Sequence, residues 1–220
     1  MNYKFQDILK IVIPGLYLAF AISVVIYMTN SDGQYVPDEL LNMLKTPFAN
    51  AIAVFLPFGG YIIGYLLNVV ASGLERFAYE KEWLKRPSLH VLQKWDKEYY
   101  VKDSECIFKT LGFTKTFSSE NTRLAFRKAK MSIKWNDVID NFYLQSIIAR
   151  NILMAHIIVI ITCAVVLIID ASCAMDVTMI ILALIAWCLF LNWRRRSFLY
   201  VERVFAEVTN DENKNEAEDK

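Results

Sequence analysis

The chain has 220 residues, of which 55% are hydrophobic, and its 24 basic and 23 acidic side chains nearly cancel. Soluble domains contain about 45–50% apolar residues, and the surplus here is concentrated in four blocks. The net charge of +1 gives no indication of a nucleic-acid partner. The four cysteines lack CxxC spacing, so neither a disulfide framework nor a zinc site is expected.

Four apolar blocks contain no Lys, Arg, Asp or Glu. They are Ile11–Met28, Phe48–Ala71, Ile152–Ile169 and Val177–Trp193. A helix needs about 20 mostly apolar residues to cross the hydrocarbon layer of a bilayer, and these blocks approach or meet that length. The sequence therefore predicts an all-α membrane protein with four transmembrane helices.

The charges between the blocks predict which side of the membrane each connection occupies. The 29–47 connection contains Asp32, Asp38 and Glu39 against a single base, whereas bases outnumber acids over residues 73–150. Cytoplasmic loops carry an excess of Lys and Arg. We therefore expect the 29–47 loop outside, the 73–150 segment inside, and both termini in the cytoplasm.

This topology divides the chain into five segments. They are residues 1–72, with transmembrane helices 1 and 2 and the outside loop 29–47; residues 73–150, a helical cytoplasmic domain; residues 151–193, with transmembrane helices 3 and 4; residues 194–209, a cytoplasmic amphipathic helix; and residues 210–220, a disordered acidic tail. The amphipathic helix is indicated by Phe198, Val201, Phe205 and Val208, which recur at helical intervals.

The 73–150 insert has helical rather than alternating apolar spacing. No helix breaker follows the second span until Pro87, so that span is expected to continue as a stalk. A second helix is predicted over 89–111. Ser118 or Ser119 supplies an N-cap for a third helix over 120–148.

One stripe of span two carries small and polar residues. Its members are Gly59, Gly60, Gly64 and Asn68. Gly60 and Gly64 form a GxxxG pattern, which lets helices approach closely, and Asn68 continues the same interval. We expect this stripe either to pack against another span of the same chain, or to form an oligomer interface or line a pore.

Basic residues are interleaved with aromatic ones in the insert. The candidate contacts for an anionic ligand or for anionic lipid are Arg123, Arg127, Lys128, Lys130 and Lys134. Such a surface can neutralise phosphates and stack bases, or it can be an inside-positive surface that faces lipid. The expected anchors at the membrane interface are Arg150, Arg194, Arg195 and Arg196.

No pattern in the sequence indicates an enzyme, a cofactor or a metal. Walker, GxGxxG, HExxH and GxSxG motifs are absent from the sequence. His156 lies within the third span without an acidic or second histidine partner in any span, which favours an interhelical hydrogen bond or an interfacial position over a proton or metal role.

Two function classes fit these features. A homo-oligomeric pore needs only a path lined by polar or small residues, or an apolar constriction, and the insert is suited to gating by a ligand. The alternative is a non-conducting membrane scaffold that recruits a cytoplasmic partner through residues 73–150.

The layout of two spans, a basic helical insert, two further spans and an arginine-rich cytoplasmic helix resembles small four-span membrane effectors of prokaryotic antiphage systems, such as the Hailong channel-type effector. The resemblance covers the architecture of most of the chain and carries no functional residue. It implies an oligomeric channel in the bacterial inner membrane, held shut until a nucleotide or nucleic-acid signal, or loss of a protein partner, opens it.

Overall fold

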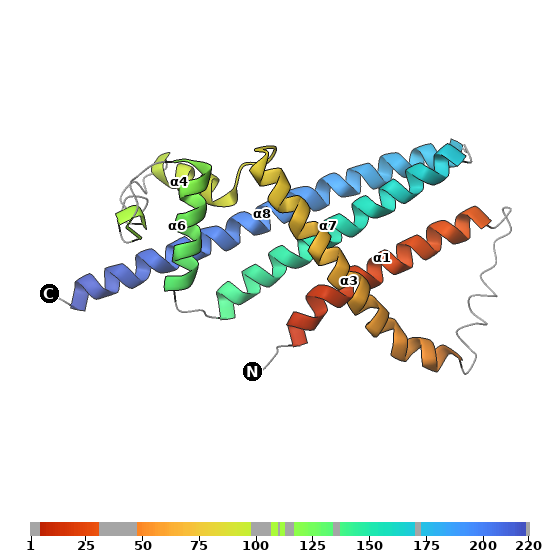
Figure 1. Ribbon diagram of the computed structural model, residues 1–220, viewed down its shortest axis with the longest axis horizontal. Coiled ribbons are helices and arrows are strands. Elements are labelled where there is room, and N and C mark those ends of the chain that lie inside the picture. The colour runs from red at the N-terminus through yellow and green to blue at the C-terminus, as the bar shows by residue number, and fades with distance from the viewer. Residues whose placement is uncertain are drawn as a thin grey trace. The chain divides into compact units, whose positions relative to one another are not determined.

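The computed structural model describes residues 5–30, 48–97, 107–109, 111–112, 117–133, 137–169 and 173–218. Over these residues the chain is helical apart from short turns (Figure 1). The helices are α1 (Phe5–Asn30), α3 (Phe48–Glu80), α4 (Pro87–Lys97), α6 (Ser119–Ser132), α7 (Asp137–Ile169) and α8 (Cys173–Glu218). The predicted all-α fold class is confirmed for the described part of the chain.

Four of these helices, α1, α3, α7 and α8, are long and apolar enough to cross a membrane. Each contains one of the four predicted apolar blocks, so the prediction of four membrane-length helices is confirmed. The α3 and α7 helices have 33 residues each and α8 has 46. Because about 20 residues cross the hydrocarbon layer, these three helices have length to continue beyond it.

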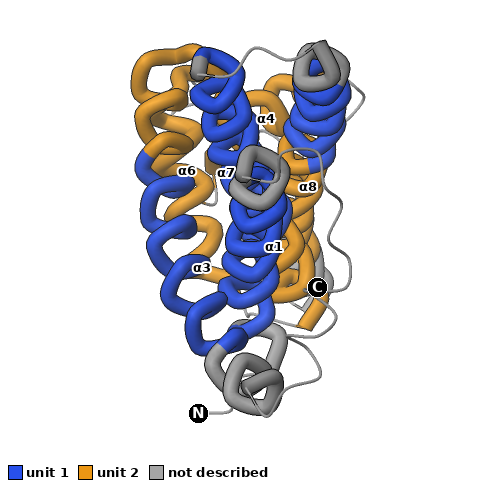
Figure 2. Tube along the Cα trace, turned by 90° about the vertical axis from the view of Figure 1, so that its right-hand side faces the viewer, with its two compact units in different colours: residues 1–73, 147–192 blue, residues 74–146, 193–220 orange. Residues whose placement is uncertain are grey.

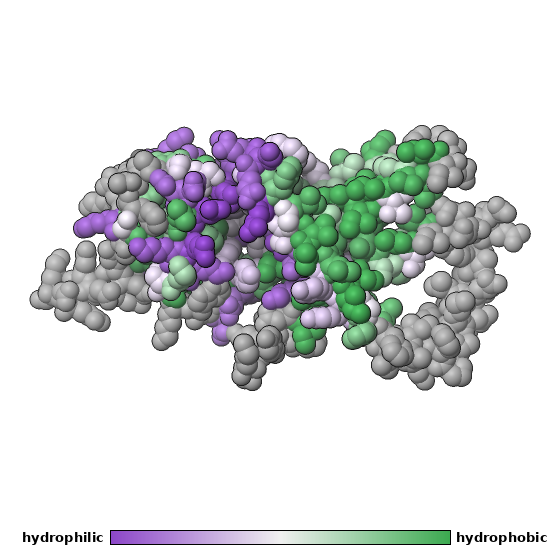
Figure 3. Space-filling model, viewed as in Figure 1, coloured by the Kyte–Doolittle hydropathy of each residue, from purple (hydrophilic) through white to green (hydrophobic). Residues whose placement is uncertain are grey.

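The apolar helices expose large hydrophobic side chains. Leu66 of α3 is 60% exposed, Ile168 of α7 is 85% exposed and Leu184 of α8 is 63% exposed. In Figure 3 apolar residues gather over one part of the surface and hydrophilic residues over another. Apolar surface of this extent is unfavourable in water and is accommodated by lipid, which agrees with a multi-pass membrane protein.

The chain divides into two compact units (Figure 2). Unit 1 comprises Met1–Gly73 and Ile147–Asn192, and unit 2 comprises Leu74–Ser146 and Trp193–Lys220. The α3, α7 and α8 helices each pass from one unit into the other without a break. Unit 2 therefore joins the predicted insert to the helix that follows the fourth span.

Unit 1 has a core formed by its apolar helices. Its buried members are Leu18, Leu67, Ala155, Val159 and Cys163. Partly buried side chains from α1, α3, α7 and α8, among them Ile22, Ile63 and Leu182, pack against them. All four helices thus contribute to one core.

Unit 2 has its own core, which is rich in aromatic rings. Its buried members are Val91, Leu92, Trp95, Ile107, Phe108, Leu111, Ala125, Ala129, Ile133, Ile139, Tyr200, Val201, Val204, Phe205 and Val208. Phe205 of α8 packs edge to face on Trp95 of α4 and on Phe126 of α6, with ring centroids 6.4 and 5.8 Å apart. The C-terminal part of α8 therefore supplies one wall of this core.

The α3 helix ends at Glu80, earlier than the stalk predicted to run to Pro87. The amide of Lys81 still donates to the carbonyl of Phe77, but Glu82 adopts a left-handed conformation with φ of 57°. Trp83 then folds back edge to face on the Phe77 ring, with centroids 5.3 Å apart. Packing of an aromatic side chain thus stabilises a turn where the sequence contains neither Gly nor Pro.

The helix predicted over 120–148 is instead two helices, so that prediction was wrong. Ser118 is the N-cap of α6, and its side chain accepts a hydrogen bond from the amide of Asn121 at 3.1 Å. Ile133 ends α6 in an extended conformation and is buried in the unit 2 core. The next helix, α7, begins at Asp137, where acidic side chains in the first turn complement the helix dipole.

The α8 helix runs unbroken from the fourth span to Glu218. The sequence predicted a boundary at 209 and a disordered tail over 210–220, which differs from the helix that the structure has over 210–218. This stretch contains no Gly or Pro, and its Ala, Glu and Lys residues have good helix propensity. A helix already stabilised by the unit 2 core can therefore continue through it.

Candidate functional site

The glycine stripe of α3 packs against α1 within the same chain. A Cβ atom added at Gly64 would overlap the backbone carbonyl of Ile11, and one added at Gly60 would lie 2.7 Å from the Leu16 side chain. Gly15 of α1 completes the contact, because a Cβ there would overlap the Gly60 carbonyl. Of the roles open to Gly60 and Gly64, the structure thus shows intramolecular packing.

The residues of the α1 contact differ from the predicted stripe at two glycines. A Cβ at Gly59 would meet nothing within 4 Å, so Gly59 does not belong to the α1 contact. Gly15, which sequence reasoning did not single out, does belong to it. Gly15 has no GxxxG partner in span one, and only its pairing with Gly60 and Gly64 of the other helix reveals its role.

Asn68 is engaged by α7. Its Oδ1 atom accepts hydrogen bonds from Arg150 Nη2 at 2.7 Å and from Asn151 Nδ2 at 3.2 Å. Asn151 is fully buried. Arg150, expected as an interface anchor, is therefore hydrogen-bonded to Asn68 of α3. The side-chain carbonyl oxygen of Asn68 accepts both of these hydrogen bonds from the same chain.

Replacement of Asn68 by leucine should destabilise unit 1. The change removes the acceptor shared by Arg150 and Asn151, and a lost bond to a buried or charged donor costs about 1–3 kcal/mol. Thermal unfolding in detergent should show the loss for Asn68→Leu, whereas Asn68→Asp, which keeps an acceptor, should retain stability. Equal unfolding midpoints for Asn68→Leu and the wild type would show that these bonds contribute nothing.

His156 bridges three helices. Its Nε2 atom lies 3.0 Å from the carbonyl of Leu182 in α8, and its Nδ1 atom lies 2.6 Å from the hydroxyl of Tyr17 in α1. A carbonyl oxygen can only accept, so Nε2 carries the proton, and the Tyr17 hydroxyl donates to Nδ1. The predicted interhelical hydrogen bond of His156 is confirmed.

The predicted basic residues do not form one patch. Lys128 donates to the carbonyl of Leu111 at 2.5 Å, and Lys130 lies over the ring of Tyr143, 4.8 Å from its centroid. Partial burial lowers the pKa of Lys130. Arg127 is exposed, and Lys134 lies outside the described residues. Arg123 lines a pocket.

Two of the three arginines that follow the fourth span donate hydrogen bonds within unit 2. Arg194 donates to the Tyr79 hydroxyl at 3.2 Å and to the Lys85 carbonyl at 2.8 Å. Arg196 donates to the side chain of Gln145 in α7, and Arg195 is exposed. Two of the three expected anchors thus connect α8 to neighbouring elements of the same unit.

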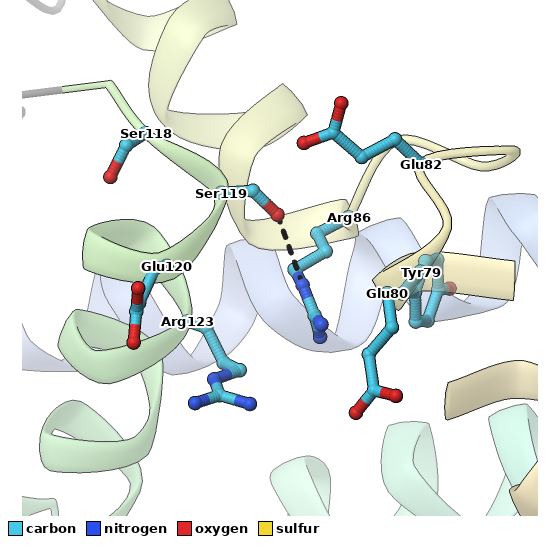
Figure 4. A pocket seen from close by; sticks show the side chains of 8 residues that line it. All are labelled: Tyr79, Glu80, Glu82, Arg86, Ser118, Ser119, Glu120 and Arg123. Atoms are coloured by element: carbon cyan, nitrogen blue, oxygen red, sulfur yellow. Dashed lines mark hydrogen bonds between the residues drawn. The ribbon is translucent and has the colours of Figure 1, made fainter. Parts of the chain in front are cut away.

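Unit 2 contains a polar pocket of about 390 Å³ between the turn after α3 and the start of α6 (Figure 4). Its lining residues are Tyr79, Glu80, Glu82, Arg86, Ser118, Ser119, Glu120 and Arg123. Pockets for small ligands have volumes of roughly 300–1,000 Å³. Of the residues that line it, only Arg123 was predicted as a ligand contact.

Arg86 is held in place at this pocket. Its Nε atom donates to Ser119 Oγ at 3.1 Å, and its guanidinium carbon lies 5.3 Å from the centroid of the Tyr79 ring. Burial, and then the positive charge of Arg123, lower the pKa of Arg86. No proximity between Arg86 and Arg123 was evident from the sequence, because the contact depends on the turn at Glu82.

The described residues contain no group of three His, Cys, Asp or Glu side chains placed to hold a metal ion. The side chains that line the pocket offer hydrogen-bonding groups and charges of both signs. No protein-family model, curated protein or solved structure matches this chain.

Proposed function

We propose that this protein is a homo-oligomeric membrane pore, a channel-type effector gated through unit 2. Its proposed location is the bacterial inner membrane, with both termini cytoplasmic, and its proposed role is antiphage defence. The observation that carries the gating proposal is the continuity of α3, α7 and α8 from unit 1 into unit 2. In this proposal, a change in the arrangement of these helices in unit 2 is passed to unit 1 along the continuous helices.

The packing of unit 1 restricts where a pore can form. The four apolar helices of one chain pack on one core cluster, which supports placing the proposed conducting path between copies of the chain. Gly60, Gly64 and Asn68 are engaged by α1 and α7, so they do not supply its lining. The exposed side chains of α8, such as Leu184 and Trp187, favour an apolar constriction that gates by dewetting.

The pore proposal is tested by ion flux from proteoliposomes. Purified protein should release a trapped ion above the rate of protein-free liposomes. Replacing Ile147 and Ile148 of α7, at the unit boundary, by two glycines should change this flux, because glycine makes a helix interior flexible. The matched control replaces the same pair by two alanines, which removes the same side chains and keeps the helix.

The alternative is a non-conducting scaffold that recruits a cytoplasmic protein partner through unit 2. It is favoured by the hydrogen bonds that Asn68, His156 and Tyr17 form within the chain. Because these polar side chains are bonded inside the chain, they do not line a path for ions. Folded protein that leaves liposomes tight, together with recovery of a stoichiometric partner, would select the scaffold over the pore.

A further inference from the structure

The pocket of unit 2 brings together Arg86 and Arg123, neither of which forms an ion pair with a described residue, although the charges of Glu80 and Glu75 partly offset that of Arg86. Arg86 uses Nε for its bond to Ser119, which leaves its two terminal NH₂ groups as donors. Among the described residues, Arg123 has no hydrogen bond or ion pair. In Figure 4 both guanidinium groups turn toward the same space. Two like charges placed close together repel each other, and an anion bound between them lowers this repulsion.

The acidic residues of the pocket limit what this anion can be. Glu80, Glu82 and Glu120 also line the pocket, and Glu80 lies 4.0 Å from Arg76 on the solvent-facing side of α3. A long polyanion would be repelled by these carboxylates. A compact oxyanion between the two arginines meets fewer of these carboxylates than a long polyanion does. In Figure 4 the Glu80 carboxylate turns to the same side as both guanidinium groups, so a hydrogen-bond donor on the ligand is suited to it.

We propose that this pocket binds a phosphomonoester group, which Arg86 and Arg123 hold between them. A carboxylate is satisfied by one guanidinium, whereas a phosphomonoester has three terminal oxygens and close to two negative charges, which match two guanidinium groups. The phosphate belongs either to a small soluble molecule or to a lipid headgroup. Binding of the phosphomonoester to this pocket does not require that the protein conducts ions. Only an effect of the bound ligand on ion flux rests on the proposed function.

The test compares two probes with the same headgroup. Full-length protein in neutral detergent is titrated with glycerol 3-phosphate by calorimetry, with glycerol as the control. In parallel, its unfolding midpoint is measured in phosphatidylcholine nanodiscs with and without phosphatidic acid. Binding of glycerol 3-phosphate assigns the site to soluble ligands, and stabilisation by phosphatidic acid alone assigns it to lipid.

The decisive variant is Arg123→Gln, because Arg123 makes no bond that the fold needs. It should raise the dissociation constant for the responding probe by about tenfold or more, the effect of losing one charge-assisted contact. Arg86→Gln should do the same if it folds. The matched control, Arg127→Gln, changes an exposed arginine on the same helix outside the pocket and should alter affinity by less than about twofold.

Three results would overturn the proposal: neither probe binds, Arg123→Gln binds as well as the wild type, or Arg127→Gln loses as much affinity as Arg123→Gln. The last result would show nonspecific attraction by the basic surface of α6. None of these outcomes depends on ion flux, so failure of the site is distinguished from failure of the pore.

Discussion

Substitution of Gly64 by alanine should separate α1 from α3 and destabilise unit 1. A single added methyl would overlap the backbone carbonyl of Ile11, and backbone cannot rotate away as a flexible side chain can. Overpacking costs about 1–3 kcal/mol, with larger values where backbone must move. For a chain of this size the thermal midpoint in detergent should fall by roughly 5–10 °C.

Gly59→Ala is the matched control, on the same helix and with the same chemical change. A Cβ at Gly59 meets nothing within 4 Å, and alanine has a better helix propensity than glycine by about 1 kcal/mol. The control should therefore match or exceed the stability of the wild type. Equal losses at positions 59 and 64 would show that α1 and α3 do not pack through these glycines.

Substitution of Phe205 by alanine should lower the free energy of unfolding of unit 2 more than any substitution of an exposed residue in α8. Phe205 is fully buried and contacts the rings of Trp95 and Phe126. Removal of a buried phenyl ring costs about 3–5 kcal/mol through lost apolar burial and the cavity left behind. Limited proteolysis of the purified protein should then cut the 74–146 segment faster than in the wild type.

Arg203→Ala is the control for this experiment, since Arg203 is exposed on the same turns of α8. Cleavage of the 74–146 segment should keep its wild-type rate in this variant. A wild-type rate of cleavage in Phe205→Ala would mean that the C-terminal part of α8 does not pack in the unit 2 core.

Apolar runs without charge made the four membrane-length helices predictable, because hydrocarbon excludes ionised side chains whatever the tertiary packing. The N-cap at Ser118 was predictable for a similarly local reason, since a serine hydroxyl meets the free amides of the first turn. The intervals of Phe198, Val201, Phe205 and Val208 predicted an amphipathic helix, and these side chains do face the unit 2 core.

The features that the sequence did not reveal depend on contacts between distant segments. The turn at Glu82 is stabilised by Trp83 on Phe77, although no breaker marks it. The break after Ile133 depends on burial of that side chain in unit 2. Gly15 pairs with glycines 45 or more positions away, and Arg86 meets Arg123 only after the chain has folded. The spacing of apolar residues along the sequence does not predict these contacts.

An electron-microscopy map of the purified assembly tests the pore most directly. The pore proposal predicts a closed ring of copies with apolar helices around an axial path, and a unit 2 on each copy continuous with α3, α7 and α8. A monomer, or an assembly whose membrane region is filled along its axis with no constriction between copies, would contradict it.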